Sequence, residues 1–190
     1  MATETLRPNA AGDKTEMDEE EPIGSDHWDV TSDQSDATYL KQINGLDTDL
    51  YNLPAHSGSG TINSIKVYTR GYLSSDSGAG ESYIVIKTGG TEYKSEAKAW
   101  PFGVWTTTDK TWDTNPDTEV AWTWDDIDAL QIGVEIQGIG IRWTYCSEVY
   151  VEVDYTPVGW QGKISGVSNP AKVMGVDAAN IAKVKGVASA

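Results

Sequence analysis

The residues of this chain that could perform catalysis or bind a metal are few. There are two histidines, His27 and His56, and one cysteine, Cys146. Neither histidine belongs to a His-x-x-x-His or Cys/His spacing, so the sequence does not indicate a transition-metal site. A nucleophilic triad would need Cys146 or a serine beside a histidine. Cys146 lies between two predicted strand segments, where we expect it to pack as a small apolar residue. We therefore expect no enzyme activity, no metal and no cofactor.

Carboxylates are abundant, with 29 acidic side chains in the chain. A glycosidase needs two of them across a groove, about 5–9 Å apart, and five acidic residues cluster late in the sequence: Asp125, Asp126, Asp128, Glu135 and Glu152. Because acidic residues are common throughout, we interpret this cluster as solvated charges. The run Asp47-Thr48-Asp49 begins like a calcium loop but lacks its later glycine and glutamate, so we expect a simple turn.

Aromatic residues offer a second kind of chemistry, the stacking of sugar rings. The chain holds eight tryptophans and nine tyrosines. Exposed aromatic rings can form a binding platform, and the candidates here are Trp100, Trp105, Trp112 and Trp143. The favoured interpretation is that these side chains fill a core or line a subunit interface, where Trp and Tyr are enriched.

The stretch from 115 to 134 is the clearest guide to the fold that carries these residues. Asn115-Pro116 favours a turn, and Thr123 with Asp126 three residues later predicts a capped helical turn. The following residues, Leu130 to Ile136, alternate between apolar and polar or small side chains, which is typical of a half-buried strand. A last alternating strand with Val149, Val151 and Val153 has the same pattern, so we expect these apolar residues in the core.

The rest of the chain shows no βαβ alternation and no long amphipathic helix. We expect roughly eight to ten strands. The predicted fold class is an all-β, jelly-roll-like antiparallel β-sandwich over residues 39–157. An extended acidic N-terminal arm, residues 1–38, precedes it, and a C-terminal repeat tail, residues 158–190, follows it.

Charge differs sharply between these parts. The whole chain has a net charge of −15. The arm holds eleven acidic and two basic side chains, whereas the tail has four lysines and one aspartate. So acidic a chain is a poor partner for nucleic acid. We find no signal peptide, and no apolar stretch reaches the ~20 residues needed to span a membrane. We expect Trp28 to pin the arm against its own domain or a neighbouring subunit.

The tail contains three related hexapeptides, which begin at Gly162, Ala171 and Ala182. Each provides two apolar side chains, a lysine and a flexible glycine, and is too short to fold alone. We interpret the tail as a docking segment that adds short β segments to another subunit. The expected docking residues are Ile164, Val167, Val173, Val176, Val184, Val187, Lys172 and Lys183.

Several of these segments resemble structural proteins of tailed phages and environmental viruses. Residues 49–62, 115–134 and 149–155 resemble their jelly-roll domains, and the run 166–176 resembles their tails. The resemblance implies a non-enzymatic virion protein, of capsid decoration or head-fibre type first and of tail type second. It would self-associate or bind other virion subunits and assemble in the host cytoplasm. The alternative is a carbohydrate-binding adhesion module that binds host-surface glycans.

Overall fold

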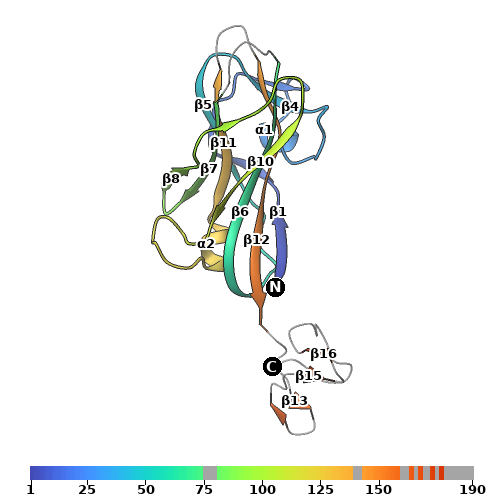
Figure 1. Ribbon diagram of the computed structural model, residues 1–190, viewed down its shortest axis with the longest axis vertical. Helices are drawn as coiled ribbons and strands as arrows, with labels where there is room; N and C mark the ends of the chain where they lie inside the picture. The colour runs from blue at the N-terminus through green and yellow to red at the C-terminus, as the bar shows by residue number, and fades with distance from the viewer. Residues whose placement is uncertain are drawn as a thin grey trace.

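The computed structural model describes residues 1–74, 81–138 and 143–158, and the backbone of four two-residue strands between 163 and 177. In this part of the chain, two antiparallel β-sheets pack face to face as a long sandwich (Figure 1). The predicted fold class, an all-β jelly-roll-like antiparallel β-sandwich, is confirmed.

The first sheet lies nearer the viewer in Figure 1. In spatial order it contains β10 (Thr106–Trp112), β6 (Gly60–Leu73), β12 (Thr144–Pro157), β4 (Tyr39–Gln42) and β3 (Glu19–Glu21), and β1 (Ala2–Leu6) also pairs with β12. The strands β6 and β12 are the longest, at 14 residues each, and they pair along almost their whole length. They therefore form the centre of this sheet.

The second sheet lies behind the first. In spatial order it contains β2 (Ala10–Thr15), β5 (Gly45–Asn52), β11 (Gln131–Gly138), β7 (Glu81–Thr88) and β8 (Thr91–Lys94), and β9 (Lys98–Ala99) also pairs with β7. Its central strand β11 is buried at five successive positions, from Ile132 to Ile136. The apolar–polar alternation of this strand predicts burial of one face only. In the structure the outer face is covered as well, because Glu135 is also buried.

The hydrophobic core lies between the sheets, where the alternating strands place their apolar side chains. Ile132 and Val134 of β11 are fully buried, as are Val149, Val151 and Val153 of β12. All five were predicted as core residues from their alternation with polar neighbours, and the prediction is confirmed. Burying each such side chain contributes about 1.5–3 kcal/mol relative to leaving it exposed.

The helical turn predicted before β11 is present as α2 (Trp124–Asp128). Its first turn is closed by a reciprocal capping box. The N–H of Asp126 donates to Thr123 Oγ1 at 3.2 Å, and the N–H of Thr123 donates to Asp126 Oδ2 at 2.8 Å. Trp122 and Ile127 flank the cap and are buried, which anchors the turn to the core.

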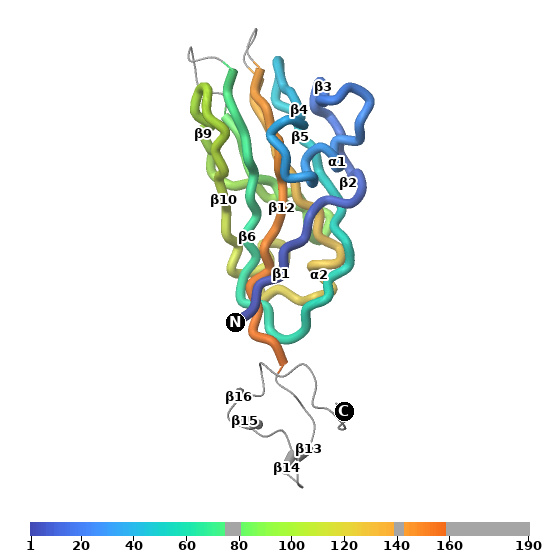
Figure 2. The backbone as a smooth tube through the Cα atoms, turned by 90° about the vertical axis from the view of Figure 1, so that its right-hand side faces the viewer, coloured from blue at the N-terminus to red at the C-terminus, as the bar shows by residue number. Residues whose placement is uncertain are grey.

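Residues 1–38, expected to form an arm, take part in both sheets. The strands β1 and β3 join the first sheet and β2 joins the second, so the chain crosses the side of the sandwich (Figure 2). Leu6 and Met17 enter the core, and Trp28, in α1 (His27–Val30), packs against it. The folded domain therefore begins near Ala2 and not at residue 39. These strands could not be recognised from the sequence, because the segment is rich in acidic residues and has few apolar side chains that point into the core.

A buried carboxylate, Asp49 of β5, holds this N-terminal segment in place. Its Oδ1 accepts the N–H groups of Glu16 at 2.6 Å and Met17 at 3.1 Å, and its Oδ2 lies 2.5 Å from His27 Nδ1. The Asp-x-Asp run was predicted as a turn, which is wrong, because it lies within a strand. A fully buried carboxylate is tolerated here because these donors satisfy it.

The imidazole of His27 provides a pH dependence. Its hydrogen bond to Asp49 raises the pKa of His27 above its usual value, and Glu20, 3.4 Å from Nε2, adds to this. The pKa of a histidine in an unfolded chain is about 6.5. Below that pH, His27 is protonated and its ion pair with Asp49 stabilises the fold in full. We expect the free energy of unfolding in urea to fall as pH rises through the folded pKa of His27. The variant His27→Gln should lose that part of the pH dependence, and an unchanged profile would contradict the assignment.

Part of the repeat tail is described at the backbone level. It forms two hairpins, which pair β13 (Lys163–Ile164) with β14 (Val167–Ser168) and β15 (Lys172–Val173) with β16 (Val176–Asp177). In each, the two apolar positions of one hexapeptide are directly opposite, as Ile164 with Val167 and Val173 with Val176. Their side chains lie outside the described residues, as do the side chain of Lys172 and all of Lys183, Val184 and Val187. The docking role of the tail stays a prediction.

Candidate functional site

Four aromatic side chains gather on the outer face of the first sheet. Tyr39 comes from β4, Tyr145 from β12 and Tyr72 from β6, while Trp105 directly precedes β10. The neighbours of each tyrosine within its strand are buried, so strand alternation directs the tyrosine rings outward. Tyr145 and Tyr72 are directly opposite in the ladder, and the residue after Trp105 pairs with Gly71. Four adjacent chain segments therefore place their rings side by side.

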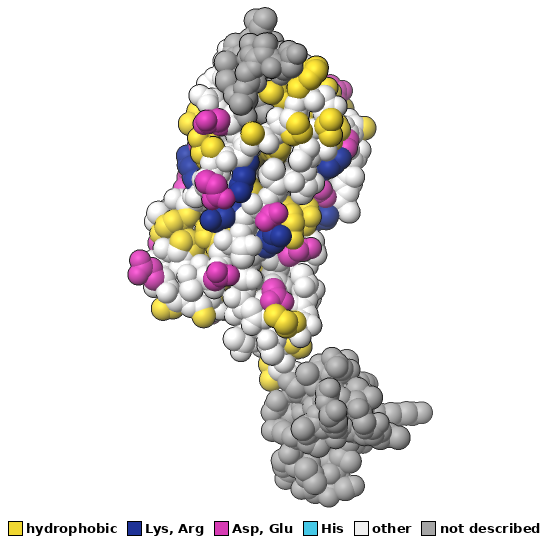
Figure 3. Space-filling view, viewed as in Figure 1, with side chains coloured by type: hydrophobic (Ala, Val, Ile, Leu, Met, Phe, Trp, Pro, Cys, Tyr) yellow, Lys and Arg dark blue, Asp and Glu magenta, His cyan; other side chains and the backbone are white. Residues whose placement is uncertain are grey.

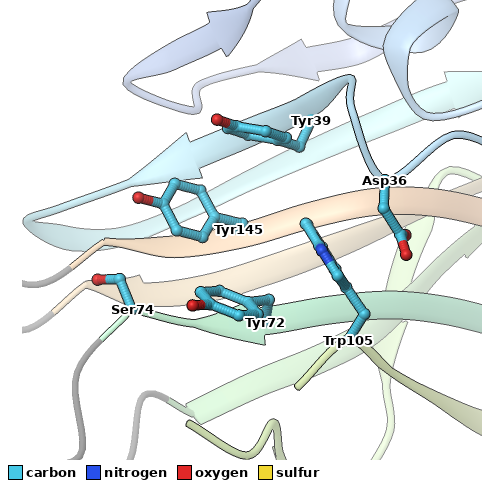
Figure 4. Close-up of a pocket in the computed structure, with 6 residues that line it drawn as sticks. All are labelled: Asp36, Tyr39, Tyr72, Ser74, Trp105 and Tyr145. Carbon is cyan, nitrogen blue, oxygen red and sulfur yellow. The ribbon is translucent and has the colours of Figure 1, made fainter. Parts of the chain in front are cut away.

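The rings form a bowl rather than a flat stack (Figure 4). Tyr39 and Tyr145 have ring centroids 4.9 Å apart, and Tyr145 and Tyr72 are 5.6 Å apart. Trp105 closes the group, at 5.3 Å from Tyr72 and 6.0 Å from Tyr39. Neighbouring ring planes are inclined by 40–66°. Such tilted contacts are favourable for aromatic pairs and fix the shape of the bowl without a ligand.

A pocket of about 330 Å³ lies at this bowl. We call it the aromatic pocket, and its lining residues are Asp36, Tyr39, Tyr72, Ser74, Trp105 and Tyr145. The polar residues Asp36 and Ser74 lie at opposite ends, with the rings between them (Figure 4). Ligand pockets typically combine aromatic walls with a few placed polar groups, and this one has that character.

The carboxylate of Asp36 is held in one orientation by a bidentate pair with Arg70. Arg70 Nε donates to Oδ1 at 2.8 Å and Nη2 donates to Oδ2 at 2.7 Å, while Ser147 Oγ donates to Oδ1 at 2.9 Å. The hydrogen bond from Arg70 lowers the pKa of Asp36 below its usual value, and Ser147 adds to this. Asp36 is therefore an anion that accepts hydrogen bonds, and it is unsuited to act as a general acid near neutral pH.

The same sheet carries another aromatic pair, which has no open ring face. Tyr68 and Tyr150 stack at 4.5 Å with their planes 7° apart. Arg7 covers the Tyr150 ring at 4.7 Å, and Lys66 lies over the Tyr68 ring at 4.9 Å. Figure 3 shows hydrophobic side chains in the upper part of this face and mixed charges below them. The aromatic pocket is thus the more accessible of the two clusters.

Trp105 is positioned by the loop 100–105. This loop packs on the end of β6, where the N–H of Leu73 donates to Pro101 O at 3.3 Å and the N–H of Gly103 donates to Leu73 O at 3.1 Å. At its start, Trp100 is buried with its ring directly over Gly71. A Cβ at position 71 would lie 2.1 Å from the Trp100 ring, so a glycine is required there.

This contact gives a testable prediction. We expect Gly71→Ala to displace Trp100 and the loop that carries Trp105, with a destabilisation of about 1–3 kcal/mol in urea unfolding. In a Trp100→Leu background, where the ring is absent, the same change should be much less destabilising. Equal losses in both backgrounds would show that Trp100 is not the group that Gly71 accommodates.

Of the four tryptophans considered as candidates for stacking on sugars, only Trp105 lines the pocket. Trp100 and Trp112 are 3% and 9% exposed and belong to the core, so their ring faces are closed to a ligand. Trp143 is half-buried, and its main chain makes two hydrogen bonds of 3.0 Å with Ser74. The favoured interpretation, that large aromatics fill the core, therefore holds for two of them.

The three tyrosines and Asp36 of the pocket were not predicted as site residues from the sequence. Tyr72 and Tyr145 occupy outward positions of alternating strands, a pattern that the sequence does contain. Their proximity to Tyr39 depends on strand order, which the sequence does not show. Trp28, expected to pin the N-terminal segment against its own domain or a neighbouring subunit, packs against the protein's own core.

Cys146 and His56, the other residues considered for chemistry, lie outside the aromatic pocket and pack within the domain. Burial raises the pKa of the Cys146 thiol to about 12, so it is not a nucleophile at neutral pH. His56 Nδ1 lies 2.7 Å from Asp128, and its ring stacks on Trp124 at 4.6 Å. In the described ranges, no group of three or more His, Cys, Asp or Glu residues could hold a metal ion. The helices found there are also too short to cross a membrane.

No family model matches the chain, and no curated protein matches it. Among solved structures, it is similar to the C-terminal CBM6 of a marine laminarinase from Zobellia galactanivorans, with 14% identity over 80% of this chain and 100% of the other, at a TM-score of 0.41. A carbohydrate-binding module from Cellvibrio mixtus lichenase 5A, in complex with cellotriose, shows 14% identity over 81% and 98%, also at 0.41. A cyclase from Fischerella shows 11% identity over 80% and 84%, at 0.38. At such scores the similarity carries no information on a ligand.

Proposed function

We propose that this protein is a non-catalytic glycan-binding protein whose binding site is the aromatic pocket. The observation that carries the proposal is the bowl of four half-buried rings, bounded by a carboxylate at one end and a hydroxyl at the other. A sugar ring has an apolar face of C–H groups and an edge of hydroxyls. The rings of the bowl suit the face, and Asp36 and Ser74 suit the edge.

The pocket has the features of a binding site and lacks those of a glycosidase. Hydrolysis of a glycosidic bond by a pair of carboxyl groups needs one of them protonated. Among the described residues, one carboxylate lines the pocket, that of Asp36, and Arg70 keeps it ionised. Binding without turnover is therefore the function that the lining residues support.

The test is a glycan array probed with the full chain, followed by calorimetric titration of the best glycan. We expect Trp105→Ala to weaken binding at least about 10-fold, because the ring supplies one wall of the bowl. The matched control is Tyr83→Ala, which removes an aromatic ring from β7 of the opposite sheet. The control should bind as the wild type does.

Two results would overturn the proposal. The first is the absence of any glycan signal for the folded wild-type protein. The second is a signal that Trp105→Ala and Tyr83→Ala reduce equally, since the pocket would then not be where the sugar binds. Circular dichroism of both variants ensures that lost binding is not lost folding.

A virion location remains a separate prediction, carried by the resemblance to structural proteins of tailed phages and environmental viruses. None of the three structures reported above is a viral structural protein. A glycan-binding sandwich on a particle surface would serve host adhesion, so the two proposals are compatible. Electron microscopy of particles with a labelled protein tests the location independently of the glycan array.

A further inference from the structure

The hydrogen-bonding capacity of Asp36 limits what the aromatic pocket can accept. A carboxylate offers about four acceptor positions on its two oxygens. Arg70 and Ser147 together occupy two positions on Oδ1, and Arg70 occupies one on Oδ2. One position on Oδ2 is left, and it can only receive a donor. A ligand with an O–H or N–H group at this end of the pocket can therefore donate to Asp36, whereas an anionic group cannot.

Two cations in the described part of the chain, Arg70 and Lys41, lie beside the pocket and have anionic partners. Arg70 is paired with Asp36 and lies also 3.5 Å from Trp105 O. Lys41, whose Nζ lies 5.7 Å from the Tyr39 ring centroid, is within 3.6 Å of Glu19 and 3.3 Å of Glu21. A carboxylate or sulfate on a ligand would thus find both of these described cations neutralised, and it would face the negative charge of a chain with net charge −15.

We propose that the aromatic pocket selects neutral, hydroxyl-rich sugars and discriminates against uronic acids and sulfated sugars. This inference rests on the proposed glycan-binding function and adds the substrate class. The ion pair between Asp36 and Arg70 is the basis of this selectivity. Asp36 neutralises Arg70, which could otherwise bind an acidic sugar, and Arg70 holds the Asp36 carboxylate as an acceptor for a hydroxyl.

The arrangement does not favour an organic cation. Quaternary ammonium groups bind between aromatic faces that leave room for them. Here Tyr39 and Tyr145 are already in contact at 4.9 Å, and Trp105 lies 5.3 Å from Tyr72. The nearest anion, Asp36, is compensated by Arg70. Binding of choline to the pocket is therefore an outcome that would count against the inference.

The experiment compares glycan pairs that share a backbone and differ chiefly in whether their substituents are charged. Suitable pairs are methyl-esterified and de-esterified homogalacturonan, hydroxyethyl and carboxymethyl cellulose, and dextran and dextran sulfate, together with choline. We expect the wild-type chain to bind neutral members only, with an affinity that changes little with salt. The variant Asp36→Asn leaves Arg70 without its anion, so we expect the ratio of neutral to anionic affinity to fall about 10-fold.

The outcomes separate the inference from the function on which it rests. Binding to anionic members through the pocket, abolished by Trp105→Ala, would overturn the neutral selectivity and leave glycan binding intact. Binding of choline in place of any glycan would overturn both. An unchanged ratio in Asp36→Asn, with the variant folded, would show that the ion pair does not set the selectivity. The inference is supported if the wild type binds neutral glycans only and Asp36→Asn lowers the ratio of neutral to anionic affinity.

Discussion

Val151→Asp is expected to unfold the protein. Val151 is at the centre of β12 and is fully buried in the core between the sheets. The aspartate would lose its hydration, and the surrounding apolar side chains offer no partner for its charge. Substitutions of this kind exceed about 4–5 kcal/mol, which approaches the whole stability of a typical domain. Far-ultraviolet circular dichroism and urea unfolding measure the loss.

The matched control is Thr156→Asp, which adds the same side chain at an exposed position of the same strand. We expect it to change the free energy of unfolding by less than about 0.5 kcal/mol. A folded Val151→Asp protein with a wild-type unfolding midpoint would contradict the core assignment of β12.

Asp49→Ala is expected to have the second-largest effect. The change removes the acceptor of the N–H groups of Glu16 and Met17 and the partner of His27, all of which join the N-terminal segment to β5. Removing one member of a buried charged pair destabilises by about 3–5 kcal/mol, because the remaining groups stay buried without partners. We expect a large fall in the urea midpoint and rapid proteolysis before residue 30.

The control for this change is Asp109→Ala, which breaks an exposed pair with Lys66 at 3.2 Å. Exposed pairs of this kind contribute about 0–1 kcal/mol, so the control should remain close to the wild type. If both variants lost the same stability, Asp49 would not be the group that fixes the N-terminal segment.

Much of the sandwich could be predicted from the sequence because it depends on local pattern. The alternation of Val149, Val151 and Val153 defined a buried face, and the Thr123 and Asp126 pair defined a capped turn. The N-terminal strands could not be predicted in this way. Their side chains are mostly polar on both faces, and what fixes them is a distant buried carboxylate, Asp49, and backbone pairing with β12.

The candidate site was predicted only in part for a similar reason. Trp105 was identified by residue type alone, and the same criterion also selected Trp100 and Trp112, which are core residues. What distinguishes them is the order of strands across the sheet. That order brings Tyr39 and Tyr145 beside Trp105 although more than 100 residues of sequence separate the two tyrosines. No local pattern contains that information.

The pairing of β1 with β12 has a consequence for how the protein is made. Residues 2–6 find their partners at residues 151–155, nearly the whole domain away along the chain. Such high contact order slows folding, because the entropy of closing a long loop is lost before the pairing is gained. At about 5–20 residues per second, a ribosome exposes β1 for roughly 8–30 s before its partner exists. During that time β1 is an unpaired strand on the nascent chain, and the first sheet can close only after release of residue 155 from the exit tunnel.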